Sequence, residues 1–168
     1  MNLQEGQIKF IETWGKLGSE WGINRTMASI HALLLITPEE LSAEEIMEKL
    51  QISRGNANMN LRDLIGWGLV DKILKPGDRK EYFFADKDIW NIAKQVAKER
   101  RKRELDPVTK VLSELSVIEG DMKDPEYATF MNSINGIQKF TNNMSKTLDT
   151  MFKAEENWFW GSLFKMFK

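Results

Sequence analysis

The residues best suited to chemical recognition lie in one short stretch, residues 53–66, which reads SRGNANMNLRDLIG. Among them are Arg54, Asn56, Asn58 and Arg62. An arginine guanidinium can donate two hydrogen bonds to guanine O6 and N7, and an asparagine amide can pair in the same way with adenine N6 and N7. Asparagine is a poor residue for the middle of a helix. A helical stretch rich in asparagine therefore indicates a face that meets the edges of base pairs.

On a helical wheel of about 100° per residue, this stretch has an apolar side and an opposite, polar side. The apolar side holds Ala57, Leu61, Leu64 and Ile65. The polar side holds Gly55, Asn56, Met59, Arg62 and Asp63, and its flanks hold Arg54, Asn58 and Asn60. Two interpretations stay open, because a polar face on a short helix can also be a solvated surface.

The predicted DNA contacts of this stretch are Ser53, Arg54, Asn56, Asn58, Met59 and Arg62. Asn56, Asn58 and Arg62 are the predicted base-reading residues. Ser53 and Arg54 stand at the start of the helix, where free N–H groups and the helix dipole attract phosphates. We expect those two residues to contact the DNA backbone.

The surrounding chain predicts the elements that position this helix. Apolar residues at three- and four-residue steps predict helices over residues 4–22 and 26–36, with Thr26 as the N-cap of the second helix. Ser42, followed three residues later by Glu45, forms a capping-box pattern that opens a short third helix. Ser53 caps the asparagine-rich helix, and a glycine at 66 or 68 ends it.

Two strands are predicted after this helix, over residues 69–74 and 81–85, with a turn at Pro76-Gly77 between them. The order of helix, helix, helix, strand, turn and strand is that of a winged helix-turn-helix, whose second helix enters the major groove while the hairpin reaches the adjacent backbone or minor groove. The predicted hairpin contacts are Lys75, Arg79 and Lys80. Arg79 at the tip would enter the minor groove, held in position by Asp78. A solvated hairpin rich in lysine is the alternative.

The remainder of the chain is predicted to be helical and to join two subunits. Helices are expected from about residue 89, from Pro107 to Gly120, and after Pro125. In the last of these, apolar positions recur in alternating steps of four and three: Phe130, Ile134, Ile137, Thr141, Met144, Leu148 and Met151. A seam of this kind usually packs on another helix of the same chain. Because this chain has few other helices to cover it, a helix from a second subunit is the alternative that we expect. The aromatic tail NWFWGSLFKMFK is expected to dock on the dimer core, the alternative being a segment on a membrane surface.

Composition limits the classes of function. The chain has 168 residues, a net charge of −1, no cysteine and one histidine. The chain as a whole has no excess of positive charge that would indicate nucleic-acid binding, so a prediction of such binding depends on local clusters of basic residues. The sequence shows neither a secretory signal pattern nor an apolar run long enough to cross a bilayer. A soluble, cytoplasmic protein without membrane association is predicted.

Neither an enzyme nor a metal site is expected. The sequence offers no nucleophile-base pair, no phosphate-binding glycine loop and no ligand cluster, so we predict no catalysis, no cofactor and no metal. His31 lies in an apolar helix and is expected in the core. Trp14, Trp21 and Trp90 are candidates for an effector site, because converging aromatic faces bind quaternary ammonium groups. Tryptophan at helical spacing is also typical of a core.

Residues 41–85, LSAEEIMEKLQISRGNANMNLRDLIGWGLVDKILKPGDRKEYFFA, resemble the winged-helix regulators of the MarR type. The matching parts are the capped helix, the GLV entry to the first wing strand and the Asp78-Arg79 tip. Upstream, the WG pair and GINRTMASIHALL are similar to the GbsR-type subgroup, named for control of glycine betaine synthesis. The resemblance covers about residues 7 to 105. It implies a dimeric transcriptional regulator that binds a palindromic operator, with effectors bound between the dimer helices and the DNA-binding lobe.

The expected fold class is mainly α (α+β): a winged helix-turn-helix DNA-binding domain with long flanking dimerisation helices. We predict an N-terminal helix over 1–25 that packs with the dimer helices, the DNA-binding domain over 26–86, and a dimerisation and effector region over 87–168. The predicted function is that of a homodimeric regulator, a repressor, on a double-stranded inverted-repeat operator, with release by a small molecule. The alternative is a winged-helix adaptor that binds proteins and has no specific DNA site.

Overall fold

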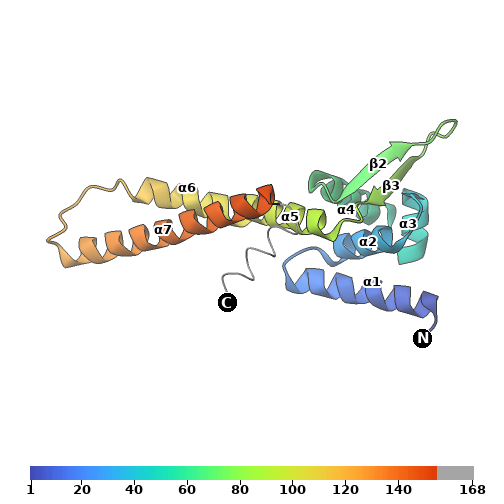
Figure 1. Cartoon of the computed structure of the whole chain (residues 1–168), viewed down its shortest axis with the longest axis horizontal. Coiled ribbons are helices and arrows are strands. Elements are labelled where there is room, and N and C mark those ends of the chain that lie inside the picture. Colours follow the sequence, from blue (N-terminus) through green and yellow to red (C-terminus); the bar gives the residue numbers. More distant parts are fainter. Residues whose placement is uncertain (155–168) are drawn as a thin grey trace. The chain divides into compact units, whose positions relative to one another are not determined.

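The computed structural model describes residues 1–154 of the chain, and the predicted docking of the aromatic tail lies outside the described residues (Figure 1). The chain divides into two compact units, Met1–Gln95 and Val96–Lys168. The predicted division at residues 25 and 86 stays a prediction. Among residues 1–154, none of the helices has both the length and the apolar character that a bilayer span requires.

The first unit is a winged helix-turn-helix, as predicted. Its elements are α1 (Leu3–Glu20), α2 (Arg25–Ile36), β1 (Leu41–Ser42), α3 (Ala43–Leu50), α4 (Arg54–Gly66), β2 (Val70–Leu74), β3 (Glu81–Ala85) and the start of α5 (Ile89–Arg100). The strands form an antiparallel sheet in the order β1-β3-β2. Leu41 pairs with Phe83, and Val70 pairs with Ala85. The two-residue strand β1 has no signal in the sequence, because it exists only through pairing with β3.

The helix ends are fixed by short polar side chains. Ser42 and Glu45 form the predicted capping box, and Ser53 caps α4 by accepting a hydrogen bond from the backbone N–H of Asn56. The predicted cap of α2 is wrong by two residues. Asn24 is the N-cap, and its side-chain oxygen accepts from the N–H groups of Thr26 and Met27.

Helix α2 is the centre of the first unit. It packs on α1, on α4 and on β3, and it is buried over most of its length. Ile30 and Leu34 of α2 are at most 1% exposed, and they share the core with Ile46 of α3 and Leu61 of α4. Because burial of such side chains is the main stabilising contribution to folding, α2 holds α1, α3, α4 and β3 together.

Two glycines let α1 approach α2 closely. A Cβ atom added at Gly18 would lie 2.5 Å from the Ala28 Cβ, and one added at Gly15 would lie 2.5 Å from the Ser29 Oγ. Real Cβ atoms do not come so near, and the Ala28 Cβ is fixed to the backbone, so Gly18 requires glycine, whereas the Ser29 hydroxyl opposite Gly15 can rotate away. Figure 1 shows α1 lying along α2.

The C-terminal end of α2 is closed by a lysine from the loop between β3 and α5. The Lys87 ammonium donates hydrogen bonds to the carbonyl oxygens of Leu34, Leu35 and Thr37, at 2.6 to 2.8 Å. These oxygens include carbonyls that the end of a helix leaves unpaired, and a cation there also opposes the helix dipole. Partial burial lowers the pKa of Lys87.

The core holds one titratable side chain, His31 of α2. It is 4% exposed and lies beside the Trp14 ring, with the ring centroids 6.4 Å apart. Its Nε2 has no hydrogen-bond partner among the described residues. Burial, with the positive charge of Lys87 as a smaller cause, lowers the pKa of His31 to about 4.

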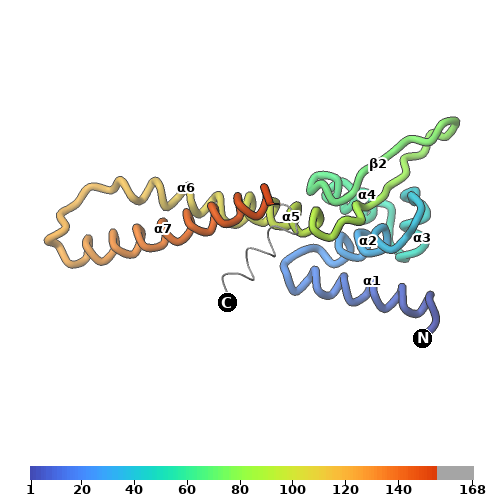
Figure 2. Tube along the Cα trace, viewed as in Figure 1, coloured from blue at the N-terminus to red at the C-terminus, as the bar shows by residue number. Residues whose placement is uncertain are grey.

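The second unit is a helical hairpin. A π-helical segment, η1 (Arg101–Leu105), continues directly into α6 (Asp106–Leu115), and α7 (Pro125–Lys153) runs back beside α6 (Figure 2). The predicted helix start at Pro107 is thus a continuation, and α6 ends at Leu115 rather than at Gly120. Arg101 pairs with Asp149 of α7 and with Asp106, which ties the two arms together.

The predicted seam of α7 is partly buried and partly exposed. Ile134 and Thr141 are buried, and Met131, which the seam did not include, is buried with them. Phe130, Ile137 and Met144 are 41 to 48% exposed. The exposed apolar positions of this unit also include Val108 and Val111 of α6. An apolar surface on both arms of the hairpin therefore has no cover within residues 1–154.

Replacing Gly18 by alanine should destabilise the protein by about 1–3 kcal/mol, because the added methyl forces α1 away from α2. Gly6 of the same helix is a matched control, since nothing lies within 4 Å of a Cβ added there. Gly6→Ala should stabilise by about 0.5–1 kcal/mol through helix propensity alone. Urea unfolding of both variants measures the difference. Equal stabilisation by both substitutions would mean that α1 and α2 lie further apart than described.

Acidification should destabilise the protein between pH 6.5 and 4 through His31. The pKa in the folded protein, about 4, lies below the ordinary value of 6.5, so the unfolded chain binds the proton first. The contribution of neutral His31 to the free energy of unfolding is fully present above pH 6.5 and is lost as the pH falls. The total loss below the folded pKa is about 3 kcal/mol. Unfolding free energies from pH 7 to 5 measure the slope. His31→Gln, which does not titrate there, should give a flatter profile, and an unchanged slope would contradict the assignment.

Candidate nucleic-acid interface

The outer face of α4 presents Asn58, Met59 and Arg62 to solvent. Met59 is 52% exposed, and Asn58 and Arg62 are exposed as well. Neither of these two polar side chains has a hydrogen bond or an ion pair within the described part of the chain. Their donors and acceptors are therefore available to an external partner. The wheel position predicted for Ala57, Leu61 and Leu64 on the opposite side is confirmed by their burial at 0 to 2% exposure.

Asn56 and Asn60 lie on the inner side of α4, which differs from the wheel. Asn60 is fully buried, and its amide donates to the backbone oxygen and to the side-chain Oδ1 of Asn56, at 2.8 and 2.7 Å. The Asn56 amide in turn donates to the Thr26 Oγ1 of α2 at 3.4 Å. The wheel is misleading here because it does not take account of α2, which packs against this flank of α4. Base reading by Asn56 would require loss of these bonds, so its position favours a role in joining α4 to α2.

The start of α4 holds Ser53 and Arg54. The Ser53 Oγ accepts the capping hydrogen bond from Asn56 at 3.3 Å, which orients the first turn of the helix. The Arg54 guanidinium lies 3.7 Å from the Glu44 carboxylate of α3, and both side chains are largely exposed. An exposed pair of this kind contributes little to stability. Arg54 can therefore exchange Glu44 for another anion at small cost.

The wing is the β2–β3 hairpin, and its tip is ordered by Asp78. Gly77 has a φ of 81°, which permits the sharp turn before Asp78. The Asp78 carboxylate accepts hydrogen bonds from the Tyr82 hydroxyl at 2.7 Å and from the Lys80 backbone N–H at 3.0 Å. The bond from Tyr82 lowers the pKa of Asp78, and the same bond raises the pKa of Tyr82.

The Arg79 side chain at this tip has no hydrogen bond or ion pair within residues 1–154. The sequence predicted that Asp78 holds this guanidinium, and that detail is wrong, because the carboxylate is used by Tyr82 and by the backbone of Lys80. Asp78 instead fixes the path of the chain. Arg79 is exposed at this tip, and its charge has no partner within residues 1–154.

Two lysines of the wing, Lys72 and Lys75, are already paired. The Lys75 ammonium lies 3.4 Å from Glu40 and 4.1 Å from the centre of the Tyr82 ring. A backbone hydrogen bond of its own residue and the contact with Lys75 lower the pKa of Glu40. Lys72 pairs with Glu81 across the two strands. The Lys80 side chain has no ion pair within the described residues.

Acidic residues near the interface are the feature that sequence reasoning missed. Glu40 and Glu44 read as ordinary acidic residues at the start of a helix, where they favour the dipole. In the fold they approach Lys75 and Arg54, which stand far from them in the sequence. Between residues 39 and 81 the acidic residues outnumber the basic ones. Only the pairing of β1 with β3 and of α3 with α4 brings these charges together.

The predicted effector residues Trp14, Trp21 and Trp90 are not brought into one cage. Trp14 is half-buried, and its ring contacts are with Phe10 and His31. Trp21 is 54% exposed at the end of α1. The ring contacts described for residues 1–154 do not pair these tryptophans with one another. An effector site built from them stays a prediction without geometric support.

Comparison with known proteins found a family match for the central segment of the chain. Residues 21–81 match the MarR family. The match to this family model runs from the end of α1 through α4 and the wing to the first residue of β3. The segment with the exposed α4 face and the Arg79 tip lies within the matched residues.

Two further comparisons found similar proteins. The chain is 30% identical over 84 residues to the HTH-type transcriptional regulator MmpR5 of Mycobacterium tuberculosis, a match over 49% of this chain and 51% of that protein. The chain thus spans about half the length of this curated relative. A crystal structure described as a transcriptional regulator superposes with a TM-score of 0.66 at 20% identity, over 87% of this chain and 95% of that one. At this identity the superposition supports the fold and no more.

Asn60→Ala should destabilise the protein by about 1–3 kcal/mol, because it removes a buried amide that is hydrogen-bonded to Asn56. Asn58→Ala on the outer face of the same helix is the matched control and should change the unfolding free energy by less than about 0.5 kcal/mol. Chemical denaturation of both variants measures the contrast. Similar losses in the two variants would show that α4 is rotated relative to this description.

Proposed function

We propose that the protein is a sequence-specific DNA-binding transcriptional regulator of the MarR type. It acts as a homodimer and a repressor on an inverted-repeat operator. The observation that carries the proposal is the outer face of α4, where Asn58 and Arg62 are exposed and have no partner within residues 1–154, together with the hairpin that carries Arg79 at its tip. In a winged helix-turn-helix these are the positions that face the major groove and the adjacent backbone or minor groove.

The proposed contacts divide by chemistry. Asn58 and Arg62 read base edges, with Met59 as an apolar neighbour for a thymine methyl group. Arg79 and Lys80 of the wing contact the backbone or the minor groove, and Ser53, Arg54 and Lys75 contact phosphates. Asn56 keeps α4 in register on α2, in place of the base contact that the sequence predicted.

The homodimer in this proposal is supported by the second unit. The exposed apolar positions of α6 and α7 form a surface that a second copy would cover. Two copies of α4 would then enter successive major grooves about one helical turn apart, as paired recognition helices do. Placement in the GbsR-type subgroup, release by a small molecule and a cytoplasmic location belong to the same proposal, and they are supported by the resemblance of residues 10–36.

A protein-binding adaptor is the second candidate. It is favoured by the excess of acidic residues between residues 39 and 81 and by the net charge of −1. The two functions differ in their response to salt. A regulator loses DNA affinity steeply as salt rises and prefers one sequence by orders of magnitude. An adaptor binds duplex DNA weakly and shows no such preference.

Selection of bound duplexes from a random pool, with the full chain, tests the proposal. The expected product is an inverted repeat whose half-sites lie about one helical turn apart. The affinity for that product should fall linearly with the logarithm of salt concentration. Recovery of no enriched sequence at low salt would overturn the regulator in favour of the adaptor.

Arg62→Ala and Arg79→Ala should impair binding in different ways. Loss of Arg62 should cost about 1–3 kcal/mol at particular base pairs and relax the preference there. Loss of Arg79 should weaken binding evenly across sequences and reduce the salt slope by about one. Titration of each variant against the selected operator and against single-base variants measures both effects.

The matched control is Lys16→Ala on α1, a solvent-exposed cation away from α4 and the wing, which should leave both quantities unchanged. If Arg62→Ala keeps its affinity and its sequence preference, α4 does not read bases in the proposed register.

A further inference from the structure

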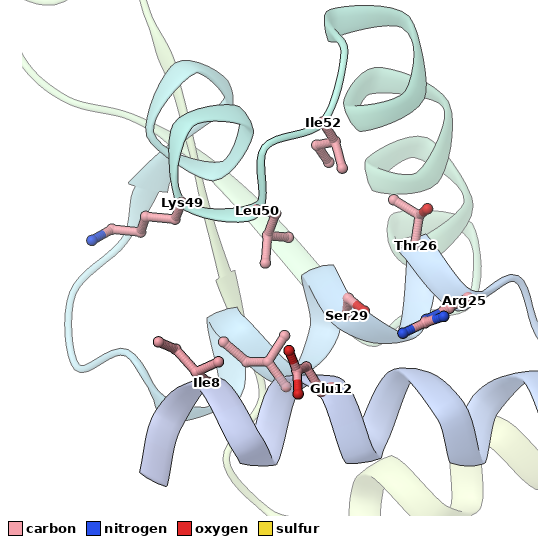
Figure 3. Close-up of a pocket in the computed structure, with 9 residues that line it drawn as sticks. Ile8, Glu12, Arg25, Thr26, Ser29, Lys49, Leu50 and Ile52 are labelled. Carbon is pink, nitrogen blue, oxygen red and sulfur yellow. The ribbon is translucent and has the colours of Figure 1, made fainter. Parts of the chain in front are cut away.

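A cavity of about 320 Å³ lies between α1, α2 and the turn that joins α3 to α4. Its walls are Ile8, Ile11, Glu12, Arg25, Thr26, Ser29, Lys49, Leu50 and Ile52 (Figure 3). The volume is at the lower end of the range for small-molecule sites, roughly 300–1,000 Å³. None of the predicted effector tryptophans takes part in it. The cavity is therefore a separate candidate site within the first unit.

Two opposite charges line this cavity without being paired. Glu12 comes from α1 and Arg25 from the first turn of α2, and neither has an ion pair within 4.0 Å among the described residues. Figure 3 shows the Ser29 side chain between them in this view, with the Lys49 ammonium pointing away. Thr26 adds a second hydroxyl. The polar side of the cavity thus offers an anion, a cation and hydroxyl groups.

The opposite side of the cavity is apolar. Ile8 from α1 faces Leu50 and Ile52, which flank the turn between α3 and α4 (Figure 3). A second cavity of about 370 Å³ shares Ile8, Ile11 and Lys49 with the first and continues along α1 toward Leu33 and Ile36. A ligand with a small charged head and a branched aliphatic side chain would match both sides.

We propose that this cavity binds a small zwitterion of the aliphatic α-amino-acid class. The ammonium group of the ligand lies on Glu12 and its carboxylate on Arg25, with the Ser29 and Thr26 hydroxyls as additional partners. The side chain of the ligand packs on Ile8, Leu50 and Ile52. Charged hydrogen bonds on both ends give the selectivity, because a ligand that lacks one charge leaves Glu12 or Arg25 uncompensated.

Residues in the wall of the cavity also contact α4 or flank the turn that precedes it. Thr26, on the wall, accepts the hydrogen bond from Asn56 of α4. Leu50 and Ile52 lie on either side of Gln51, the one non-glycine residue with a positive φ among residues 1–154. A ligand that contacts these residues binds one arrangement of the α3–α4 turn more tightly than others. Such a difference in affinity is what a ligand needs to shift the population between conformations.

Calorimetric titration of the full chain without DNA tests the site, so the outcome does not depend on the proposed regulation. The probes are L-leucine, L-leucinamide, which lacks the carboxylate, and 4-methylpentanoate, which lacks the ammonium. L-leucine should bind about tenfold or more tightly than either analogue, since each lost charged hydrogen bond costs that much. Hydrogen exchange of backbone amides in residues 49–56 should slow with L-leucine bound.

Variants assign the two ends of the ligand. Glu12→Gln should remove the preference for L-leucine over 4-methylpentanoate, and Arg25→Gln should remove the preference over L-leucinamide. Glu20→Gln, at the exposed end of α1 and away from the cavity, should behave as the unmodified protein. Each substitution changes a ratio between two ligands, which a loss of folding alone would not do.

Two outcomes overturn the proposal. The first is equal binding of L-leucine and one of its analogues to the unmodified protein, which would show a site for a single charge. The second is no heat and no change in exchange with L-leucine at millimolar concentration. DNA binding in the selection experiment can succeed in either case, so failure of the site and failure of the regulator are distinguishable.

Discussion

The packing of α2 against α1, α3, α4 and β3 is the constraint on which the first unit depends. Ile30 and Leu34 exclude water from its contacts with α1, α4 and β3. The polar groups at its two ends are satisfied by other elements: Asn24 caps the start, and Lys87 from the loop after β3 closes the end. Because α2 touches both the recognition helix and the sheet that carries the wing, a change in α2 would move both parts of the candidate interface together.

Much of the fold could be predicted, because it is encoded locally. The Ser42 and Ser53 caps, the two wing strands and the Gly77 turn depend on residues within a few positions of one another, and the structure has each of them. The misses share a different cause. The strand β1, the burial of Asn60 and the ion pairs of Glu40 and Glu44 arise from contacts between distant segments, which periodicity does not encode.

The site shows the same division between local and tertiary information. The exposed side of α4 was predictable from helical spacing, and Asn58, Met59 and Arg62 lie on it. Asn56 was misplaced because its neighbour across the helix interface, Thr26, stands thirty residues away in the sequence. The roles of all these residues in DNA recognition remain proposals, since the relative with a regulatory name matches the chain over about half of its length.

The carboxylates beside Arg54 and Lys75 have a consequence for how such a protein would search a genome. A duplex that approaches α4 and the wing can displace Glu44 and Glu40 from these two cations at small cost, but the two carboxylates stay nearby and repel the phosphates, so each backbone contact brings a smaller net gain. Encounters with random sequence would then be brief, and lasting residence would depend on the hydrogen bonds that only matching base pairs offer. The acidic neighbours would thus shorten the residence time on non-operator DNA, in addition to any weakening of the operator complex.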